Sequence, residues 1–389
     1  MTMWKKVKLG DCCEITSSKR IFFSEYEDSG IPFYRSKEII ELSNGQSISE
    51  QLYISENKYN DIKRKFGVPK ENDILLTSVG SVGIPYIVNK DHRFYFKDGN
   101  LTWLHNYKDF VFPLYVFYWL RSDDCFKMLN NIALGAAQKA LTIVKLKAVE
   151  IPLPPLSVQH RIATILSRYD SLIENYQKQI KLLEEAAQRL YKEWFVELRF
   201  PGHENTKMVD GLPEGWERKK VGDLLEKIQR TKQVPANNYQ LTGNIPIIDQ
   251  SKDYIAGYTD DEECLVKVSV PFIVFGDHTR VLKYIPFSFA KGADGTQLIM
   301  SNDLDKMPQT LFYNSLVNVD LSNYSYARHF KYLKEELVVV PTKEIASSYD
   351  EVVLRAYQTI HNNRKQIRLL TEARDRLLPK LMGGEMDVI

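Results

Sequence analysis

Residues that could do chemistry are few and scattered in this chain of 389 residues. Asp277 and His278 place a carboxylate beside an imidazole at an expected strand end, where a general base or metal ligand could stand, but no nucleophile or second ligand set adjoins them. Glu56-Asn-Lys58 and Glu217-Arg-Lys219 have the acidic-x-Lys form of metal-dependent nucleases without an upstream Pro-Asp. Such short matches are more often solvated charge patterns. No catalytic constellation is therefore predicted.

Motifs that bind cofactors are also missing. There is no G-x-x-x-x-G-K-[ST] loop for ATP, and Gly80-Ser-Val-Gly83 lacks the third glycine of a dinucleotide fingerprint. The Asn-Pro-Pro-Tyr and Asp-Pro-Pro-Tyr runs of amino-methyltransferases do not occur. The four cysteines include no C-x-x-C pair, which excludes a zinc site of the usual spacing and fits a reducing cytoplasm. We expect this chain to bind no cofactor or metal itself.

Basic and polar residues gather instead at expected turns. Because Lys plus Arg is 52 and Asp plus Glu is 50, the net charge is only +2, and any nucleic-acid surface must be local. Loop tips rich in Arg, Lys, Gln, Ser and Tyr suit phosphate contact with nearby base readout, although solubility is the plain alternative. The candidates are Lys19, Arg20, Tyr34, Arg35, Ser36, Lys37, Ser78, Ser81, Arg230, Lys232, Gln250, Ser251 and Lys252.

The strongest candidates follow a predicted strand at Pro271–Phe275. Arg280 could bridge guanine O6 and N7, and Asp277 could accept a hydrogen bond from cytosine N4. The corresponding turn earlier in the chain, Thr77–Gly83, is uncharged, so the two turns should contact different bases. Two further polar loops carry Gln138 and Arg328. The Gln138 amide could form two hydrogen bonds with adenine, and the Arg328 guanidinium could form two with guanine. The remaining candidates in these segments are His278, Thr279, Lys283, Lys291, Lys139 and His329.

The chain is an internal duplication. Trp4, Gly10, Asp11 and Glu14 return at one constant offset as Trp216, Gly222, Asp223 and Glu226. Residues 178–190 align without gaps to 365–377, with nine identities in thirteen positions. The order is therefore globular unit, helix, globular unit, helix. Short runs rich in β-branched and aromatic residues, such as 73–78, 84–88 and 271–275, predict strands in the globular units, and helices are expected near 115–128 and 309–316.

Each repeated helix has a heptad seam. Apolar residues recur at steps of three and four from Ile173 to Trp194, and the second copy keeps the seam but places Asn363 and Arg374 on it. The two helices are natural partners in an antiparallel pair. Pro-rich segments mark the boundaries, which predict globular units at 1–152 and 201–341 and helices at 153–200 and 342–389. The fold class is mixed α/β, in two copies, with a coiled coil of two long helices.

The order of these motifs resembles the specificity subunits of type I restriction-modification systems. The residues that carry the resemblance are Leu9-Gly-Asp11, Asp73-Ile-Leu75, Gly80–Gly83, Gln138–Leu141, Ile151–Leu156 with Gln159, Leu190–Phe195 and Leu377–Glu385. It runs essentially from end to end of the chain. The second Pro-rich stretch, Pro341-Thr-Lys-Glu344, is degenerate.

This resemblance implies a non-catalytic recognition subunit. Two target-recognition domains would each bind one half of a bipartite, asymmetric site on double-stranded DNA. The helices would set the gap and dock two methyltransferase subunits and the restriction subunits, which carry S-adenosylmethionine, ATP and Mg²⁺. The competing interpretations are a nuclease or methyltransferase that acts alone and a coiled-coil adaptor that binds only proteins. No membrane span is expected, because the most apolar run, 110–120, is about half the required length.

Overall fold

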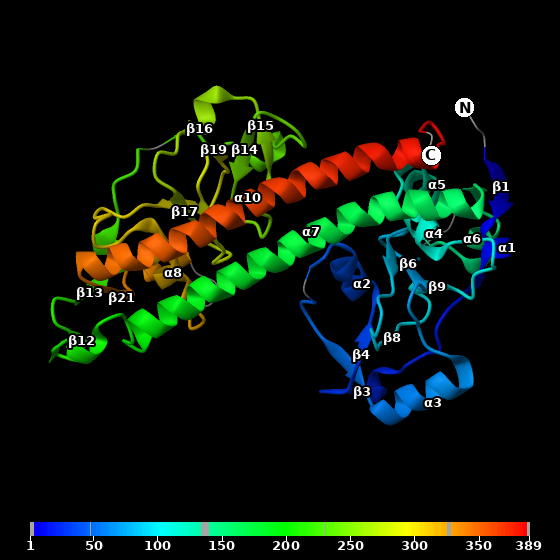
Figure 1. Cartoon of the computed structure of the whole chain (residues 1–389), viewed down its shortest axis with the longest axis horizontal. Helices are drawn as coiled ribbons and strands as arrows, with labels where there is room; N and C mark the ends of the chain where they lie inside the picture. The colour runs from blue at the N-terminus through cyan, green and yellow to red at the C-terminus, as the bar shows by residue number, and fades with distance from the viewer. Residues whose placement is uncertain (1–3, 47, 134–139, 230, 325–327, 387–389) are drawn as a thin grey trace. The chain divides into compact units, whose positions relative to one another are not determined.

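A computed structural model describes residues 4–46, 48–133, 140–229, 231–324 and 328–386. The chain forms two compact units, and each unit draws on distant parts of the sequence (Figure 1). Unit 1 contains Met1–Asn175 together with Gln366–Ile389. Unit 2 contains Tyr176–Lys365. The boundary between the units therefore cuts both long helices rather than the segments that precede them.

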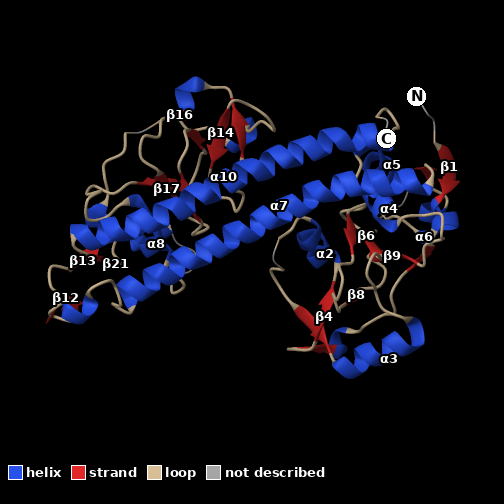
Figure 2. Cartoon of the chain, in the orientation of Figure 1, coloured by secondary structure: helices blue, strands red, loops and turns tan. Residues whose placement is uncertain are grey.

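Among the described residues of unit 1, the strands form two four-stranded sheets and a two-stranded pair (Figure 2). The first sheet is antiparallel throughout, and its order is β2 (Glu14–Thr16), β9 (Leu101–His105), β6 (Ile74–Thr77) and β7 (Pro85–Ile87). The second has the order β3 (Tyr26–Glu27), β5 (Leu52–Ile54), β4 (Ile31–Tyr34) and β8 (Tyr95–Phe96), with β4 and β8 parallel. The pair joins β1 (Lys5–Lys8) to β10 (Glu150–Leu153).

The helices of unit 1 cover these sheets. They are α1 (Leu9–Cys12), α2 (Ser36–Ser43), α3 (Glu56–Phe66), α4 (Pro113–Leu120), α5 (Asp123–Ala133) and α6 (Ile143–Lys147). The helical stretch expected near 115–128 is present, but it consists of two helices, α4 and α5. The Ser122 hydroxyl donates to the carbonyl of Trp119 and accepts from the N–H of Cys125, so Ser122 ends α4 and begins α5.

The described residues of unit 2 repeat this plan with fewer helices and with three strands in one of the two sheets. A four-stranded sheet has the order β15 (Gly257–Thr259), β14 (Ile245–Ile248), β19 (Phe289–Lys291) and β16 (Leu265–Val266). A three-stranded sheet has the order β18 (Leu282–Ile285), β17 (Phe272–Gly276) and β20 (Thr296–Ile299). Pairs join β11 (Met208–Val209) to β12 (Leu212–Pro213) and β13 (Glu217–Lys220) to β21 (Leu337–Val340). The helices are α8 (Gln309–Val317) and α9 (His329–Leu333).

Equivalent backbone hydrogen bonds confirm that the globular units are two copies of one fold. β4 and β14 each pair in parallel with a later strand, and the N–H that follows that strand donates to the last carbonyl of β4 or β14. These bonds are Lys97 to Tyr34 in unit 1 and Gly292 to Ile248 in unit 2, at 2.8 and 2.9 Å. The strands expected at 73–78, 84–88 and 271–275 are present as β6, β7 and β17.

Two long helices, α7 (Leu156–Tyr191) and α10 (Lys343–Met382), pass through both units. Pro154 and Pro155 precede α7, and Gly383 and Gly384 follow the last residue of α10. A π-helical turn, Lys192–Val196, extends α7. The predicted seam residues are all buried or half-buried, namely Ile173, Tyr176, Ile180, Leu183, Ala187, Leu190, Trp194, Ile360, Asn363, Ile367, Leu370, Arg374 and Leu377. The fold class predicted from the sequence is confirmed.

Polar contacts fix the antiparallel register of the helix pair in unit 1. Asp170 of α7 accepts hydrogen bonds from Arg374 of α10 at 2.6 Å, Tyr118 of α4 at 2.7 Å and Arg121 at 3.1 Å. One carboxylate thus joins the globular domain to both helices. Arg374 is largely buried by this contact, so its predicted position on the seam has a charged partner.

Other polar pairs do the same in unit 2. The Asn363 amide donates to Gln179 at 3.1 Å, and Arg364 forms an ion pair with Glu184 at 2.8 Å. Burial raises the pKa of Glu184, while Arg364 opposes that shift. A slip of one turn would separate these partners and leave polar groups buried without hydrogen bonds, which is costly.

Arg374→Ala should lower the free energy of unfolding by about 1–3 kcal/mol, because it leaves the partly buried Asp170 carboxylate without its closest cation. Urea unfolding followed by circular dichroism measures this loss. Arg376→Ala, which removes an exposed cation from the same helix, should change stability by less than about 0.5 kcal/mol. Equal effects of the two substitutions would show that the contact with Asp170 does not hold the helices.

Candidate nucleic-acid interface

Three strands of unit 2 end where the predicted residues gather. β14, β17 and β19 are followed by Asp249–Asp253, by Asp277–Arg280 and by Gly292–Gly295. Gln250 ties these segments together. Its side-chain amide donates to the carbonyl of Asp294 at 3.1 Å and accepts from the N–H of His278 at 3.1 Å. We call Gln250–Lys252, Asp277–Arg280, Asp294 and Arg328 the loop cluster of unit 2.

Asp277 holds a fourth segment against this cluster. Its side-chain oxygen accepts from the N–H of Phe330 at 2.8 Å, and its carbonyl accepts from the N–H of His329 at 2.9 Å. The Asp277 side chain is only 5% exposed. This arrangement places the exposed Arg328 next to the turn that carries Arg280.

Close backbone packing shapes the turn at Arg280. A Cβ atom at Gly276 would lie 2.2 Å from the hydroxyl of Thr279, so only glycine fits there. Arg280 has a φ of 61°, and its guanidinium donates to the carbonyl of Leu321 at 3.1 Å. The Arg280 side chain is thereby held in the exposed turn.

The predicted residues of unit 2 differ in exposure. Exposed residues are Lys232, Lys252, His278, Thr279, Arg280 and Arg328; half-buried ones are Gln250, Ser251 and Lys291; buried ones are Asp277, Lys283 and His329. Lys283 is 4% exposed and donates to the carbonyl of Asp253 at 2.5 Å, and burial lowers its pKa. Burial also lowers the pKa of Lys291. Arg230 lies outside the described residues.

In unit 1 the structure brings several predicted residues around one concave surface of about 640 Å³. Arg20, Arg35 and Lys97 supply positive charge to its lining, and Glu50 and Asp98 supply negative charge. Gly99 and Asn100 form a loop at its edge. The N–H of Ser78 donates to the carbonyl of Asn100 at 2.8 Å, as the N–H of Asp277 donates to the carbonyl of Gly295 at 2.7 Å in unit 2. The two loop systems therefore share one backbone scaffold.

The predicted residues of unit 1 again separate by exposure. Lys19, Arg20, Lys37 and Ser81 are exposed, Arg35 and Ser36 are half-buried, and Tyr34 and Ser78 are buried. The Tyr34 hydroxyl is bonded to His92 at 3.0 Å, and the Ser78 hydroxyl to Thr102 at 2.5 Å. Gln138 and Lys139 lie outside the described residues, although Ala140, which follows them, pairs with Val79 beside the concave surface.

Several of the candidate cations are ion-paired with carboxylates. The half-buried Arg35 contacts the fully buried Glu38 at 2.7 Å, so this pair belongs to the fold, and it also contacts Glu50 at 3.0 Å. Among the exposed cations, Arg20 contacts Asp98 at 2.9 Å, and Lys232 contacts Asp261 and Glu263 at 2.8 and 2.7 Å. Exposed pairs contribute about 0–1 kcal/mol, so a phosphate can compete with the carboxylate at little cost.

Sequence reasoning found Arg20 and Arg35 but missed the rest of the lining of the concave surface, including Phe22, Phe23, Lys97 and Asn100. Lys97 and Asn100 flank Asp98-Gly99 and stand in no motif that predicts contact with a nucleic acid. Phe22 and Phe23 follow Lys19-Arg20 after a single residue, and an aromatic pair beside two cations was the available signal.

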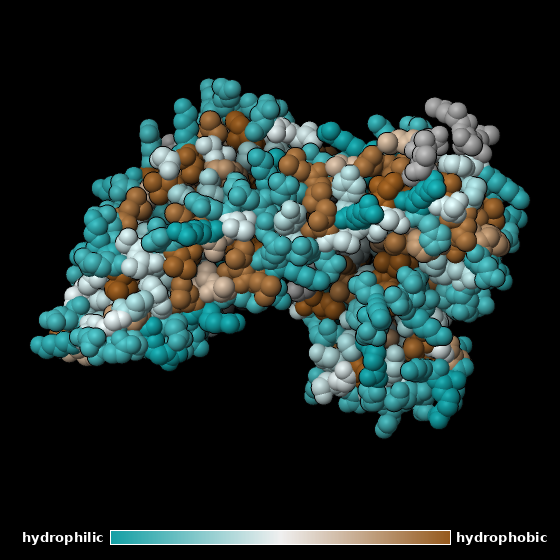
Figure 3. All heavy atoms as spheres, in the orientation of Figure 1, coloured by the Kyte–Doolittle hydropathy of each residue, from teal (hydrophilic) through white to brown (hydrophobic). Residues whose placement is uncertain are grey.

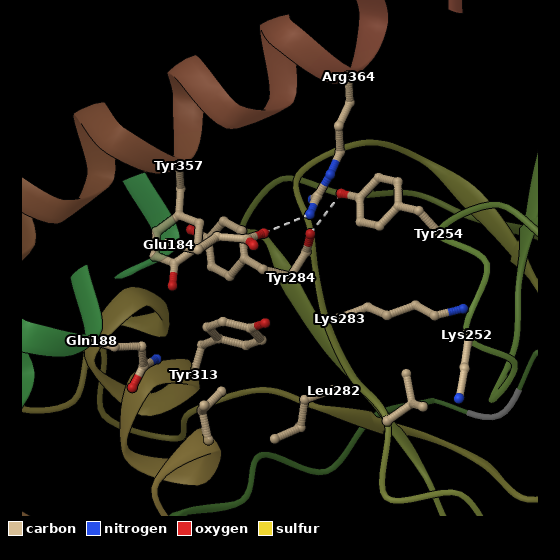
Figure 4. Close-up of a pocket in the computed structure, with 12 residues that line it drawn as sticks. Glu184, Gln188, Lys252, Tyr254, Leu282, Lys283, Tyr284, Tyr313, Tyr357 and Arg364 are labelled. Atoms are coloured by element: carbon tan, nitrogen blue, oxygen red, sulfur yellow. Dashed lines mark hydrogen bonds and ion pairs between the residues drawn. The ribbon is translucent and has the colours of Figure 1, made fainter. Parts of the chain in front are cut away.

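A second cavity, of about 330 Å³, lies in unit 2 where the domain meets the helices (Figure 4). Arg364 stacks over the ring of Tyr254 at 3.9 Å and reaches Glu184, and the Tyr254 hydroxyl donates to the carbonyl of Tyr284. Tyr284 and Tyr357 pack with ring centroids 4.6 Å apart. These contacts join β18 to α7 and α10, so the cavity belongs to the junction that positions the loop cluster.

Known proteins resemble this chain in sequence. Residues 1–185 match the family model described as the type I restriction modification DNA specificity domain. The MjaIX type I restriction enzyme specificity subunit of Methanocaldococcus jannaschii is 27% identical over 99% of this chain and 94% of its own length. Residues 1–185 thus match the type I DNA specificity domain, and the chain is similar to type I specificity subunits over nearly its whole length. This confirms the family that the sequence motifs indicate.

Further relatives support the same family. A putative type I specificity subunit of Haemophilus influenzae is 31% identical over 50% of this chain and 48% of its own length. The crystal structure of a type I restriction-modification S subunit from M. genitalium has a TM-score of 0.60 at 16% identity, and the match covers 97% of this chain and 96% of that one. This structural match supports the fold described above.

Membrane spans and metal clusters are not found in the part of the chain that the structure describes. Among the described residues, no helix is long and apolar enough to cross a membrane. Those residues also hold no group of three or more His, Cys, Asp or Glu side chains placed to bind a metal ion. On the face drawn in Figure 3, hydrophilic residues cover most of the surface of each unit.

Asp277→Ala should lower the free energy of unfolding by about 1–3 kcal/mol, because the N–H of Phe330 loses its acceptor. Arg280→Ala, in the same turn, should cost less than about 1 kcal/mol because its side chain is exposed. Urea unfolding measures both. Asp277→Asn keeps an acceptor oxygen and should restore most of the loss; a full loss in that variant would contradict the role given to this hydrogen bond.

Proposed function

We propose that this protein is the DNA-recognition subunit of a type I restriction-modification complex and reads a bipartite, asymmetric site, with one half contacted by each unit. The chain itself contributes no catalysis. Its curated relatives are named specificity subunits of type I restriction enzymes, which supports this role.

One observation carries the proposal, namely that a single backbone scaffold presents different side chains in the two units. Ser78 and Asp277 occupy equivalent positions, as the shared hydrogen bonds to Asn100 and Gly295 establish. The turn that follows carries Gly80 and Ser81 in unit 1 but Thr279 and Arg280 in unit 2. Different donors and acceptors on the same scaffold suit two different base sequences.

The exposed and buried residues would have separate roles. Arg280 and Arg328 suit guanine in the major groove, and Lys232 and Lys252 suit phosphates. In unit 1, Lys19, Arg20, Lys37 and Lys97 suit phosphates, while Ser81 suits a base edge. Gln138, Lys139 and Arg230 remain candidates from the sequence. The buried members, Tyr34, Ser78, Asp277, Lys283 and His329, would hold the loops in position rather than touch DNA.

The helices would dock the other subunits. Large apolar side chains remain exposed on them, namely Leu172 and Leu369 in unit 1 and Leu182 and Val352 in unit 2. Such residues on otherwise polar helix faces suit contact with protein partners. Two methyltransferase subunits would bind here, and restriction subunits would join for cleavage in the cytoplasm. S-adenosylmethionine, ATP and Mg²⁺ would be bound by those partners.

Methylome sequencing of cells that express the chain with its methyltransferase subunits tests this function. We expect adenine methylation at one bipartite motif, and none from the purified chain alone with S-adenosylmethionine. Arg280→Ala should relax only one half of the motif, by about 1–3 kcal/mol of discrimination, because unit 2 contacts that half. Arg328→Ala should relax the same half.

Lys37→Ala is the matched control in unit 1 and should weaken binding to all sequences while reducing its salt dependence. Equal loss on both halves from Arg280→Ala would overturn the assignment of one half to each unit. Methylation or Mg²⁺-dependent cleavage by the purified chain would support an enzyme that acts alone. Binding of protein partners without salt-sensitive DNA binding would support an adaptor.

The helices should also set the gap between the half-sites. Both helices pass from one unit to the other, α7 at Asn175–Tyr176 and α10 at Lys365–Gln366. Four residues inserted at each of these points would add about 6 Å and a rotation of about 40°. Base pairs are spaced about 3.4 Å apart. We therefore expect the same half-sites with a gap one or two base pairs longer, as read by mapping methylated sites.

The same insertion between Leu190 and Trp194 is the control. Tyr191 and Phe195 are buried in the core of unit 2, so this variant should lose stability rather than lengthen the gap. An unchanged gap in the paired insertion variant, or new half-site bases, would exclude the helices as the spacer.

A further inference from the structure

Two neighbouring aromatic side chains project from unit 1 beside its concave surface. Phe23 is 86% exposed and Phe22 is 61% exposed. Isolated apolar residues on a surface are common, but a pair of phenylalanines at this exposure loses much of the free energy that burial would provide. Both residues line the concave surface with Arg20, Arg35 and Lys97.

The backbone that carries this pair is held at both ends. Ile21, immediately before it, is buried. The carboxylate of Glu25 accepts from the N–H of Phe22 at 2.8 Å and forms an ion pair with Lys58 of α3 at 2.5 Å. The exposed rings therefore stand on an ordered turn, and presenting them to a ligand costs little conformational entropy.

The ring of Phe23 also packs on other aromatic rings of unit 1. Its ring contacts Tyr26 edge-on, with centroids 5.6 Å apart, and Tyr26 packs on the fully buried Phe33 of β4 at 5.2 Å. This row of rings connects an exposed aromatic tip to the core of the unit. A tip supported in this way resists displacement when it is pressed against a ligand.

Unit 2 lacks this feature at the equivalent place. In both units a short 3-10 turn is followed by a tyrosine that leads into the sheet. The turn is Phe23–Glu25 before Tyr26 in unit 1 and Ala236–Asn238 before Tyr239 in unit 2. Pro235 and Ala236 therefore stand where unit 1 has Phe22 and Phe23. The aromatic pair is not required to build the fold.

We propose that Phe22 and Phe23 form an aromatic wedge that stacks on bases of the half-site bound by unit 1 and unstacks a base step there. The proposal rests on the proposed function. Phenylalanine side chains inserted between base steps are a known means of unstacking and kinking a duplex.

The chemistry around the pair favours DNA as the ligand. Arg20, Arg35 and Lys97 share this surface with Asp98 and Glu50, which are paired with Arg20 and Arg35. The lining therefore has one cation more than it has carboxylates, and this excess of positive charge favours a polyanion over an apolar protein partner. At Gly99, no atom lies within 4 Å of the position that a Cβ atom would occupy. This open space beside the cations leaves room for the DNA backbone.

Fluorescence of 2-aminopurine tests the wedge in the complete complex with methyltransferase subunits. Duplexes of the mapped target carry this adenine analogue at single positions across the half-site that Arg280→Ala leaves unchanged, excluding the methylated adenine. The wild-type complex should raise the fluorescence at one step, because the base there loses its stacking neighbour. Phe22→Ala with Phe23→Ala should abolish the rise and weaken binding about 10-fold.

Phe110→Ala is the matched control, since Phe110 is also half-exposed in unit 1 but does not line the concave surface. Phe110→Ala should change neither the fluorescence rise nor the affinity for DNA. Phe23→Trp should retain the fluorescence rise. Urea unfolding of each variant verifies that the unit is intact, and Phe23→Gln alone serves if the double variant does not fold.

Unchanged fluorescence and affinity in the double variant would overturn the wedge while leaving DNA recognition intact. Loss of assembly with the methyltransferase subunits, with DNA contacts unchanged, would overturn it in favour of a protein contact. Failure of the wild-type complex to bind the bipartite duplex would instead refute the proposed function.

Discussion

The structure depends on the antiparallel pairing of two helices that each belong to both units. Burial of the apolar seams provides most of the stability of the helix pair. The seams alone would allow one helix to shift along the other, because the apolar pattern repeats with every heptad. The polar contacts remove that freedom. Two contacts can form in only one alignment of the helices, namely Asp170 with Arg374 in unit 1 and Gln179 with Asn363 in unit 2.

The same contacts extend from the helices into the domains. Tyr118 and Arg121 reach Asp170 from the domain side of unit 1, and in unit 2 Asn314 of α8 bonds to Tyr357 of α10 at 2.9 Å and to Gln188 of α7 at 2.5 Å. Each domain is thus attached to a defined part of the helix pair. This attachment also positions the loops at the strand ends. In unit 2 the loop follows β17, and in unit 1 it follows β6.

Sequence patterns predicted the architecture well because it is repetitive. The duplicated segments and the three-and-four spacing of Ile173 to Trp194 are local signals, and they predicted the helices, their pairing and the mixed α/β units. The break at Ser122 was missed, since a hydroxyl that caps two helices leaves no change in hydrophobic pattern. The candidate residues were harder to judge. Composition selects Lys283 and Arg280 equally, and only the fold distinguishes a lysine bonded to the carbonyl of Asp253 from an arginine in an exposed turn.

The composition of unit 1 has a consequence for how the protein folds as it is synthesised. Ile162, Ala163 and Leu166 share a core with Leu378, Leu381 and Met382, which leave the ribosome only after all of unit 2. The first domain can form its sheets early, but the apolar face of α7 in unit 1 stays uncovered until unit 2 and the end of α10 have been synthesised. An exposed helix face during that interval is a site for aggregation or chaperone binding. The order of synthesis therefore means that unit 1 is started before unit 2 but is completed after it.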